Sequence, residues 1–238
     1  MKRLVVCVLL ASCGGGDGAN GTIDLDNLGM ELAVVGCERQ WDCCTDVEIT
    51  EQYMGITIDG EAITTEEKCV EFSNALLTGF LTAQFKDSLA KGRIDYDGAA
   101  AADCVAAMEA VSCDQYNNDA SLVAGGCDRP FVTAKVANGG GCTEDYECTS
   151  NNCVGESTSL GEPSVDGACM PIPNEGESCD DNCAGDLICD FDQATSMDIC
   201  QPMRTNGAPC NIDSQCASDH CESGTRVCAT KPATCDGR

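Results

Sequence analysis

Cysteine is the most informative reactive residue type in this chain, because of its number and spacing. The sequence holds 22 cysteines in 238 residues, and 20 of them follow Cys13. A dense, even set in an exported chain is typical of a disulfide scaffold, in which a bridge closing about 15 residues contributes about 3 kcal/mol. We expect all of these cysteines to form disulfides, with the pairing left open. They are Cys37, Cys43, Cys44, Cys69, Cys104, Cys113, Cys127, Cys142, Cys148, Cys153, Cys169, Cys179, Cys183, Cys189, Cys200, Cys210, Cys216, Cys221, Cys228 and Cys235.

Metal binding is the rival chemistry for clustered cysteines, because zinc and iron–sulfur sites use Cys-x-x-Cys pairs. No two cysteines here are three positions apart, so we predict neither a structural metal nor a thioredoxin-like redox pair. The single histidine, His220, is expected on a loop surface. Segments 95–98 and 190–192 resemble fragments of calcium loops but lack the ligand spacing of an EF-hand, so calcium stays an alternative. No cofactor is predicted.

Catalytic motifs are missing from the sequence. There is one histidine, no G-x-S-x-G, no H-E-x-x-H and no glycine-rich phosphate loop. A carboxylate pair is the remaining catalytic option, but among 40 acidic residues no pair stands out. We expect no catalytic residue and no enzymatic activity. A disulfide-rich protease inhibitor is one alternative, and a carboxylate-based hydrolase is the weakest.

The charge of the chain is strongly negative throughout. Its net charge is −27, with −14 in residues 1–127 and −13 in residues 128–238. Such a surface repels the phosphates of nucleic acids, so no nucleic-acid partner is expected.

The amino terminus has the composition of an export signal. Lys2 and Arg3 precede a short apolar run that ends in Leu10-Ala11-Ser12-Cys13. This tetrapeptide resembles the lipobox of bacterial lipoproteins. The resemblance implies removal of residues 1–12 as a signal peptide, lipid attachment to Cys13, and anchoring to a bacterial membrane, at the outer membrane or cell surface. An ordinary Cys13 paired with Cys7 is the alternative. The apolar run is too short for a transmembrane helix, and no later segment qualifies.

Residues 13–27 read as the lipidated cysteine and a flexible, glycine-rich tether, and residues 28–126 as a small helical domain tied by disulfides. A stripe at helical spacing predicts a first helix from Leu28. Its members are Met30, Val34, Cys37, Trp41 and Cys44. The adjacent cysteines at 43 and 44 can then reach two different partners.

Two further helices are predicted after an ambiguous segment at 47–63, which fits either a small hairpin or a loop. Thr64 and Glu67 form a capping box, and Gly92 stops that helix. Asp97 is expected to cap a third helix that runs to about residue 111. The inward residues should include Leu76, Phe80 and Leu89 on the second helix and Ala101, Cys104, Val105 and Met108 on the third. We expect Cys69 and Cys104 to bridge toward the first helix or its Cys43-Cys44 corner.

From residue 127 to 238 the helical period disappears and a repeat begins. A G-x-x-C signature starting at Gly139, Gly176 and Gly207 opens three modules of four cysteines each, and its glycine is expected to serve a turn. The first module contains cysteines 142, 148, 153 and 169, the second 179, 183, 189 and 200, and the third 210, 216, 221 and 228. Beyond Cys142 only two aromatic residues remain, so disulfides must replace an apolar core, and little regular secondary structure is expected.

Parity predicts a disulfide between the two parts of the chain. Seven cysteines lie between residues 37 and 127 and thirteen between 142 and 235. Both numbers are odd, so full oxidation requires at least one bridge across the boundary. Cys127 to Cys142 is the nearest candidate.

The repeat part resembles a group of bacterial cysteine-rich lipoproteins with Dickkopf N-terminal-like and EGF-like modules. The resemblance rests on Gly-x-x-Cys142-x5-Cys148-x4-Cys153 and its near-copy ending at Cys221. The predicted anchor, the tether and the disulfide modules together favour a non-enzymatic, extracytoplasmic protein that acts in surface binding, adhesion or envelope structure. The expected partners are the membrane, through the lipid on Cys13, and a protein or glycan ligand whose identity the residues do not reveal.

Overall fold

The computed structural model describes residues 21–118, 131–155, 166–180, 182–192, 194–231 and 235. Cys7, Cys13 and Cys127 lie outside this range, so the predictions made for them stay predictions. The chain divides into two compact units. We call the part within Met1–Lys91, Tyr96–Val132 and Thr234–Arg238 the helical unit, and the part within Gly92–Asp95 and Thr133–Ala233 the repeat unit.

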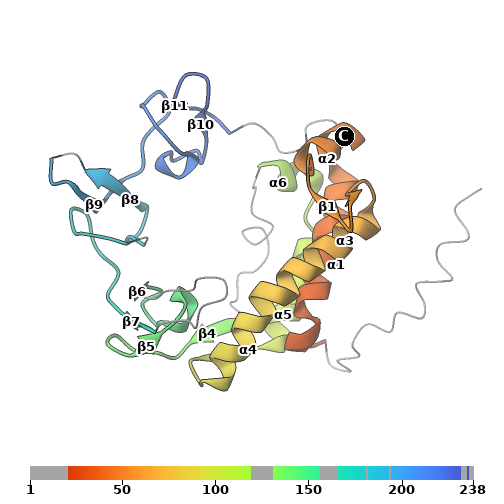
Figure 1. Ribbon diagram of the computed structural model, residues 1–238, viewed down its shortest axis with the longest axis horizontal. Helices are drawn as coiled ribbons and strands as arrows, with labels where there is room; N and C mark the ends of the chain where they lie inside the picture. The colour runs from red at the N-terminus through yellow and green to blue at the C-terminus, as the bar shows by residue number, and fades with distance from the viewer. Residues whose placement is uncertain are drawn as a thin grey trace, which may run out of the picture. The chain divides into compact units, whose positions relative to one another are not determined.

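Helices dominate the helical unit, and the longest of them, α1, packs against both α3 and α5. Figure 1 shows α3, the π-helix η3 and α4 following one another as a continuous rod alongside α1. The elements between residues 21 and 118 are α1 (Leu25–Cys43), α2 (Asp46–Gln52), β1 (Thr57–Ile58), β2 (Glu61–Ala62), α3 (Glu66–Leu76), η3 (Leu77–Thr82), α4 (Ala83–Ala90), β3 (Ile94–Tyr96), α5 (Gly98–Glu109) and α6 (Cys113–Asn118). Of these, β3 belongs mostly to the repeat unit.

The first predicted helix is present, but its buried face differs from the predicted stripe. Met30 and Val34 are 43% and 40% exposed, and Cys44 lies just after the helix. The residues of α1 that are buried are Leu28, Gly29, Ala33, Val35, Cys37, Gln40 and Cys43. The reason is that α1 packs against α3, η3, α5 and α6, so its buried surface is wider than a single stripe and includes other residues.

The second predicted helix is interrupted by a π-helical turn, which makes part of the predicted stripe wrong. Leu76, Phe80 and Leu89 were expected inside but are exposed, whereas Phe85 is buried. A π-turn inserts a residue into the α-helical repeat and rotates everything that follows, which accounts for Phe80 within the turn and Leu89 after it. Leu76 is the last residue of α3 and precedes the turn. The helix begins one residue later than predicted, with Thr65 as its N-cap, and ends before Gly92, which has the expected positive φ of 68°.

Local signals are confirmed at the remaining helical elements. The hairpin alternative is correct, because β1 and β2 pair around Asp59 and Gly60, both of which have positive φ as a type I′ turn requires. Asp97 caps α5 by accepting bonds from the backbone N–H groups of Ala99 and Ala100, both at 3.0 Å. The short helix α2 was not predicted, although Thr45 and Glu48 form a capping box that marks its start.

Three disulfides tie the helical unit together. Cys37 bonds Cys69, and the adjacent pair at 43 and 44 separates as predicted, to Cys113 and Cys235. The expectation for Cys69 is therefore confirmed. Cys104 is also disulfide-bonded, but not to the first helix or its corner, whose cysteines all have other partners.

The predicted disulfide between the two sequence regions is present, but it joins a different pair of cysteines from Cys127 and Cys142. Cys44, in the sequence region of residues 37–127, bonds Cys235, in the region of residues 142–235, across 191 residues. In the structure both cysteines belong to the helical unit. Cys142, the predicted partner of Cys127, instead bonds Cys153 inside the first module.

Nine disulfides join described cysteines, and this number indicates an oxidising, extracellular environment. Among the helices of the described residues, none combines the length and apolar character needed to cross a membrane.

The repeat unit is built from very short strands held by disulfides. Sheets contain the strand orders β5-β7-β6, β8-β9 and β10-β11, and β4 pairs with β3. The elements are β4 (Val132–Ala134), β5 (Gly141–Cys142), η4 (Asp145–Glu147), β6 (Cys153–Val154), β7 (Gly167–Cys169), β8 (Leu187–Asp192), β9 (Met197–Pro202), η5 (Asp213–Gln215), β10 (Cys221–Glu222) and β11 (Val227–Cys228).

All three modules share one disulfide order, in which the first cysteine bonds the third and the second bonds the fourth. The pairs are 142–153 and 148–169, then 179–189 and 183–200, then 210–221 and 216–228. The buried cluster of the first module is its four cysteines with Val136 packed against them. Disulfide sulfur therefore takes the place of an apolar core here.

The glycine of each G-x-x-C signature serves a turn, as predicted. Gly139, Gly176 and Gly207 have φ of 86°, 82° and 88°. Each is the third residue of a turn closed by a backbone bond, such as the one from Ala208 N–H to the Thr205 carbonyl at 3.0 Å. A positive φ at this position alone defines a type II turn, which favours glycine.

Replacing this glycine should loosen its module through backbone strain alone. A Cβ at Gly207 meets no atom within 4 Å, so Gly207→Ala tests only the positive φ, at a cost of about 1 kcal/mol. Gly224→Ala, in the same module at an ordinary φ, is the matched control. We expect the Cys228 amide, which bonds the Ala208 carbonyl, to exchange with deuterium about fivefold faster in the first variant only. Equal exchange in both variants would contradict this.

Candidate binding groove between the first two modules

The cysteines predicted to form disulfides are placed in bridges wherever the structure describes them. Each module brings three sulfur atoms within 4.8 Å of one another, for example those of Cys142, Cys148 and Cys169. All of these sulfurs are bonded in disulfides, and metals bind the thiolate form. The clusters are therefore stacked disulfides in the structure, not sets of free thiolates.

The acidic segments that resemble calcium loops use their carboxylates on groups of the protein itself. Asp95 pairs with Lys135 and Asp97 caps α5. Asp190 accepts from Arg204 and from the Gln215 amide. Asp192 accepts from the backbone and hydroxyl of Thr195, which lowers the pKa of its carboxyl group. His220 has a partly exposed side chain 3.9 Å from Glu222.

A buried ion pair organises the first module. The Glu147 side chain is fully buried, and its Oε2 lies 3.3 Å from Nη1 of Arg93. The same oxygen accepts a 2.6 Å bond from the Thr143 backbone. Burial by itself would lower the pKa of the Arg93 guanidinium, but its bond to Asp166 and the charge of Glu147 outweigh burial and raise it. Arg93 is thus held by two carboxylates, one buried and one 52% exposed.

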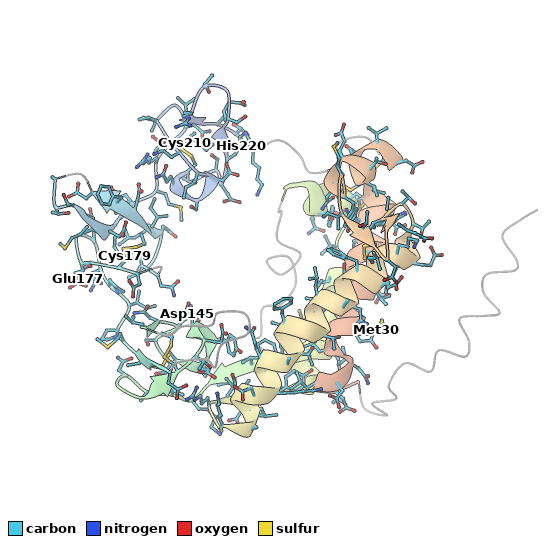
Figure 2. The ribbon with its side chains drawn as sticks, viewed as in Figure 1. Met30, Asp145, Glu177, Cys179, Cys210 and His220 are labelled. Atoms are coloured by element: carbon cyan, nitrogen blue, oxygen red, sulfur yellow. A yellow bond between two sulfur atoms is a disulfide. The ribbon has the colours of Figure 1, made fainter. Side chains whose placement is uncertain are left out.

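A groove of about 660 Å³ lies where the first module passes into the second. One wall is apolar and comes from Val154 and the run Met170-Pro171-Ile172-Pro173. The lining also includes two acidic residues, Glu177, whose carboxylate accepts a 2.7 Å bond from the Asn174 backbone, and Asp180. Figure 2 labels Glu177 and Cys179 in this part of the second module. No lysine or arginine lines the groove.

Hydrogen bonds hold the apolar run in place. The Asn152 amide donates to the Pro171 carbonyl at 3.0 Å, and the Met170 N–H donates to the Asn152 carbonyl at 2.9 Å. The Ala184 N–H bonds the Pro173 carbonyl at 2.9 Å. Because proline also restricts φ, this wall is ordered before anything binds.

The two modules are joined beside the groove. Asn182 of the second module donates from its side-chain amide to Asp145 of the first at 2.7 Å and contacts the Asn151 carbonyl at 3.2 Å. The groove can therefore present a fixed apolar surface next to negative charge. An arrangement of this kind suits an extended segment with apolar and basic side chains.

This groove is not among the features predicted from the sequence. A signal was available, because 170–173 is an apolar, proline-containing run directly after the last cysteine of the first module. This run forms a groove wall only because the Asn152 side chain holds it in place, and Asn152 lies 19 positions away from Pro171 in the sequence.

The charge of Glu147 should matter more to stability than that of Asp166. The third module has Gln215 in the equivalent place, accepting from the Asn211 backbone at 2.6 Å, so Glu147→Gln keeps the hydrogen bond and removes only the charge. We expect this variant to lower the free energy of unfolding by about 2 kcal/mol, because the Arg93 side chain, which is 13% exposed, loses its buried charged partner and keeps only Asp166. Asp166→Asn, at an exposed carboxylate, should cost less than about 1 kcal/mol. Chemical denaturation of both variants measures the difference, and equal losses would contradict it.

No protein-family model, no curated protein and no solved structure matches this chain.

Proposed function

We propose that this chain is a lipid-anchored, extracytoplasmic binding protein of the cysteine-rich lipoprotein type, with a helical disulfide-tied domain followed by three cysteine modules. The bridges leave the surfaces between cysteines free to vary, and the groove at the first two modules is the contact site for a protein partner. The observation that carries this proposal is an ordered apolar wall beside Glu177 and Asp180. No catalytic step is part of it.

The chemistry of the groove favours a basic, partly apolar partner segment. Met170 is 45% exposed on a chain whose net charge is −27. Burying the exposed half of this side chain contributes about 1 kcal/mol, and the carboxylates in the lining select positive over negative groups. Anchoring through Cys13 would hold this surface at the membrane face where such a partner is met.

Lipid anchoring is tested by removing the thiol that would be acylated. With Cys13→Ser, we expect nearly all of the protein to leave the membrane fraction, because no lipid can be attached. Cys7→Ser is the matched control and should stay with the membrane, since residue 7 belongs to the predicted signal peptide. Fractionation, with mass spectrometry of the amino-terminal peptide, gives the readout. Soluble wild-type protein without acyl chains would contradict the proposal.

The groove is tested with a purified soluble form that lacks residues 1–13, which are the predicted signal peptide and the cysteine predicted to carry the lipid. We expect peptides with an apolar residue beside lysine or arginine to bind, and versions with aspartate or glutamate in place of the basic residue not to bind. Met170→Glu should weaken binding about tenfold or more, because it removes apolar contact and adds like charge. Met203→Glu, at a methionine 37% exposed between the second and third modules and outside the groove lining, should change it less than about twofold.

Isothermal titration or fluorescence anisotropy measures both effects. Binding to glycans alone, or equal effects of the two glutamate variants, would contradict the groove as the contact site.

A further inference from the structure

The helical unit contains a cavity of about 350 Å³, a volume within the usual range of small-molecule sites. Its walls come from α1, α2, α3, η3 and α6. Leu32, Ala33 and Leu77 supply apolar surface, and Gln40, Tyr53 and Tyr116 supply polar groups. The cavity is formed entirely by the helical unit, so it is separate from the groove described above.

A buried hydrogen-bond network forms the polar side of the cavity. Gln40 is only 4% exposed, and its Oε1 accepts a 2.8 Å bond from the Tyr53 hydroxyl. Its Nε2 donates to Gln52, which uses one of the two amide N–H groups. Tyr53 is held in turn by an edge-to-face contact with Phe72, with ring centroids 6.4 Å apart.

The lining carries no charge, although acidic residues outnumber basic ones by 40 to 13 in the chain. Burial raises the pKa of both Tyr53 and Tyr116, so their hydroxyls stay neutral under physiological conditions. A charged ligand would lose its hydration without gaining an opposite charge. The lining therefore favours an uncharged molecule.

Disulfides fix the walls of the cavity before any ligand arrives. Cys37–Cys69 ties α1 to α3, and its two cysteines are part of the lining. Cys43–Cys113 ties the end of α1 to α6, the helix that carries Tyr116. In addition, the π-helix η3 begins at Leu77, a cavity residue. Such π-turns are rare and occur frequently at functional sites.

We propose that this cavity is a binding site for an uncharged small molecule with hydrogen-bonding groups on one side and an apolar or aromatic body on the other. The amide of Gln40 and the tyrosine hydroxyls orient the polar side. Leu32, Ala33 and Leu77 contact the apolar body.

Three probes of nearly equal shape test the charge preference: benzamide, which is neutral, benzoate, which is negative, and benzamidine, which is positive. We expect benzamide to bind the disulfide-bonded protein saturably, with a Kd on the order of 1 mM for a ligand of this size. The signals of the Gln40 side-chain amide should shift in two-dimensional NMR spectra. Benzoate and benzamidine should bind at least about tenfold more weakly, since their charges lose hydration.

Filling the cavity from either wall supplies the structural test. Ala33→Leu on α1 and Ser73→Leu on α3 place a larger side chain among the lining residues and should weaken benzamide binding about tenfold or more. Val34→Leu and Ala75→Leu change neighbouring exposed positions outside the lining and should leave it unchanged. If one of these two variants does not fold, the other, on the opposite helix, still provides the test.

The proposal is overturned if benzamide causes no saturable shift in the wild-type protein. It is also overturned if the charged probes bind as well as benzamide, or if the filled variants bind it as well as their controls do.

Discussion

Covalent sulfur bonds are the constraint on which the rest of this structure depends. The first and third modules bury little besides their own cysteines, and these clusters replace the apolar cores that aromatic and aliphatic residues would form. Bridges across 10 to 21 residues close the module loops, each contributing about 3 kcal/mol if unfolded-state entropy accounts for it. This mode of stabilisation requires an oxidising environment.

Cross-linking also explains how surfaces suited to binding can form in a chain with so few aromatic residues. A module fixed by two bridges and a glycine turn does not need its remaining residues for packing. Met170 and Ile172 can then line a groove, and Gln40 and Tyr53 can border a cavity. The same bridges reduce the conformational entropy that binding would otherwise cost.

The differences between expectation and structure have specific physical causes. The stripe through Met30 and Val34 assumed one packed face for the first helix, but that helix packs against α3, η3, α5 and α6. The stripe through Phe80 and Leu89 assumed an unbroken α-helical period, which the π-turn at Leu77–Thr82 shifts. The disulfide between the two sequence regions was predicted for Cys127 and Cys142 because they are close in the sequence. It is formed instead by Cys44 and Cys235, which are 191 residues apart and come together only in the folded chain.

The sequence by itself determined the features that depend on local chemistry. These are the caps at Asp97 and before Gly92, the turn at Asp59-Gly60, the module glycines and the need for a crossing disulfide. The tertiary structure decided the disulfide order, the Arg93–Glu147 pair, the groove and the cavity. Backbone geometry within a few residues sets the first group. The second group joins residues that are distant along the chain, and many pairings are compatible with the same spacing until packing selects one.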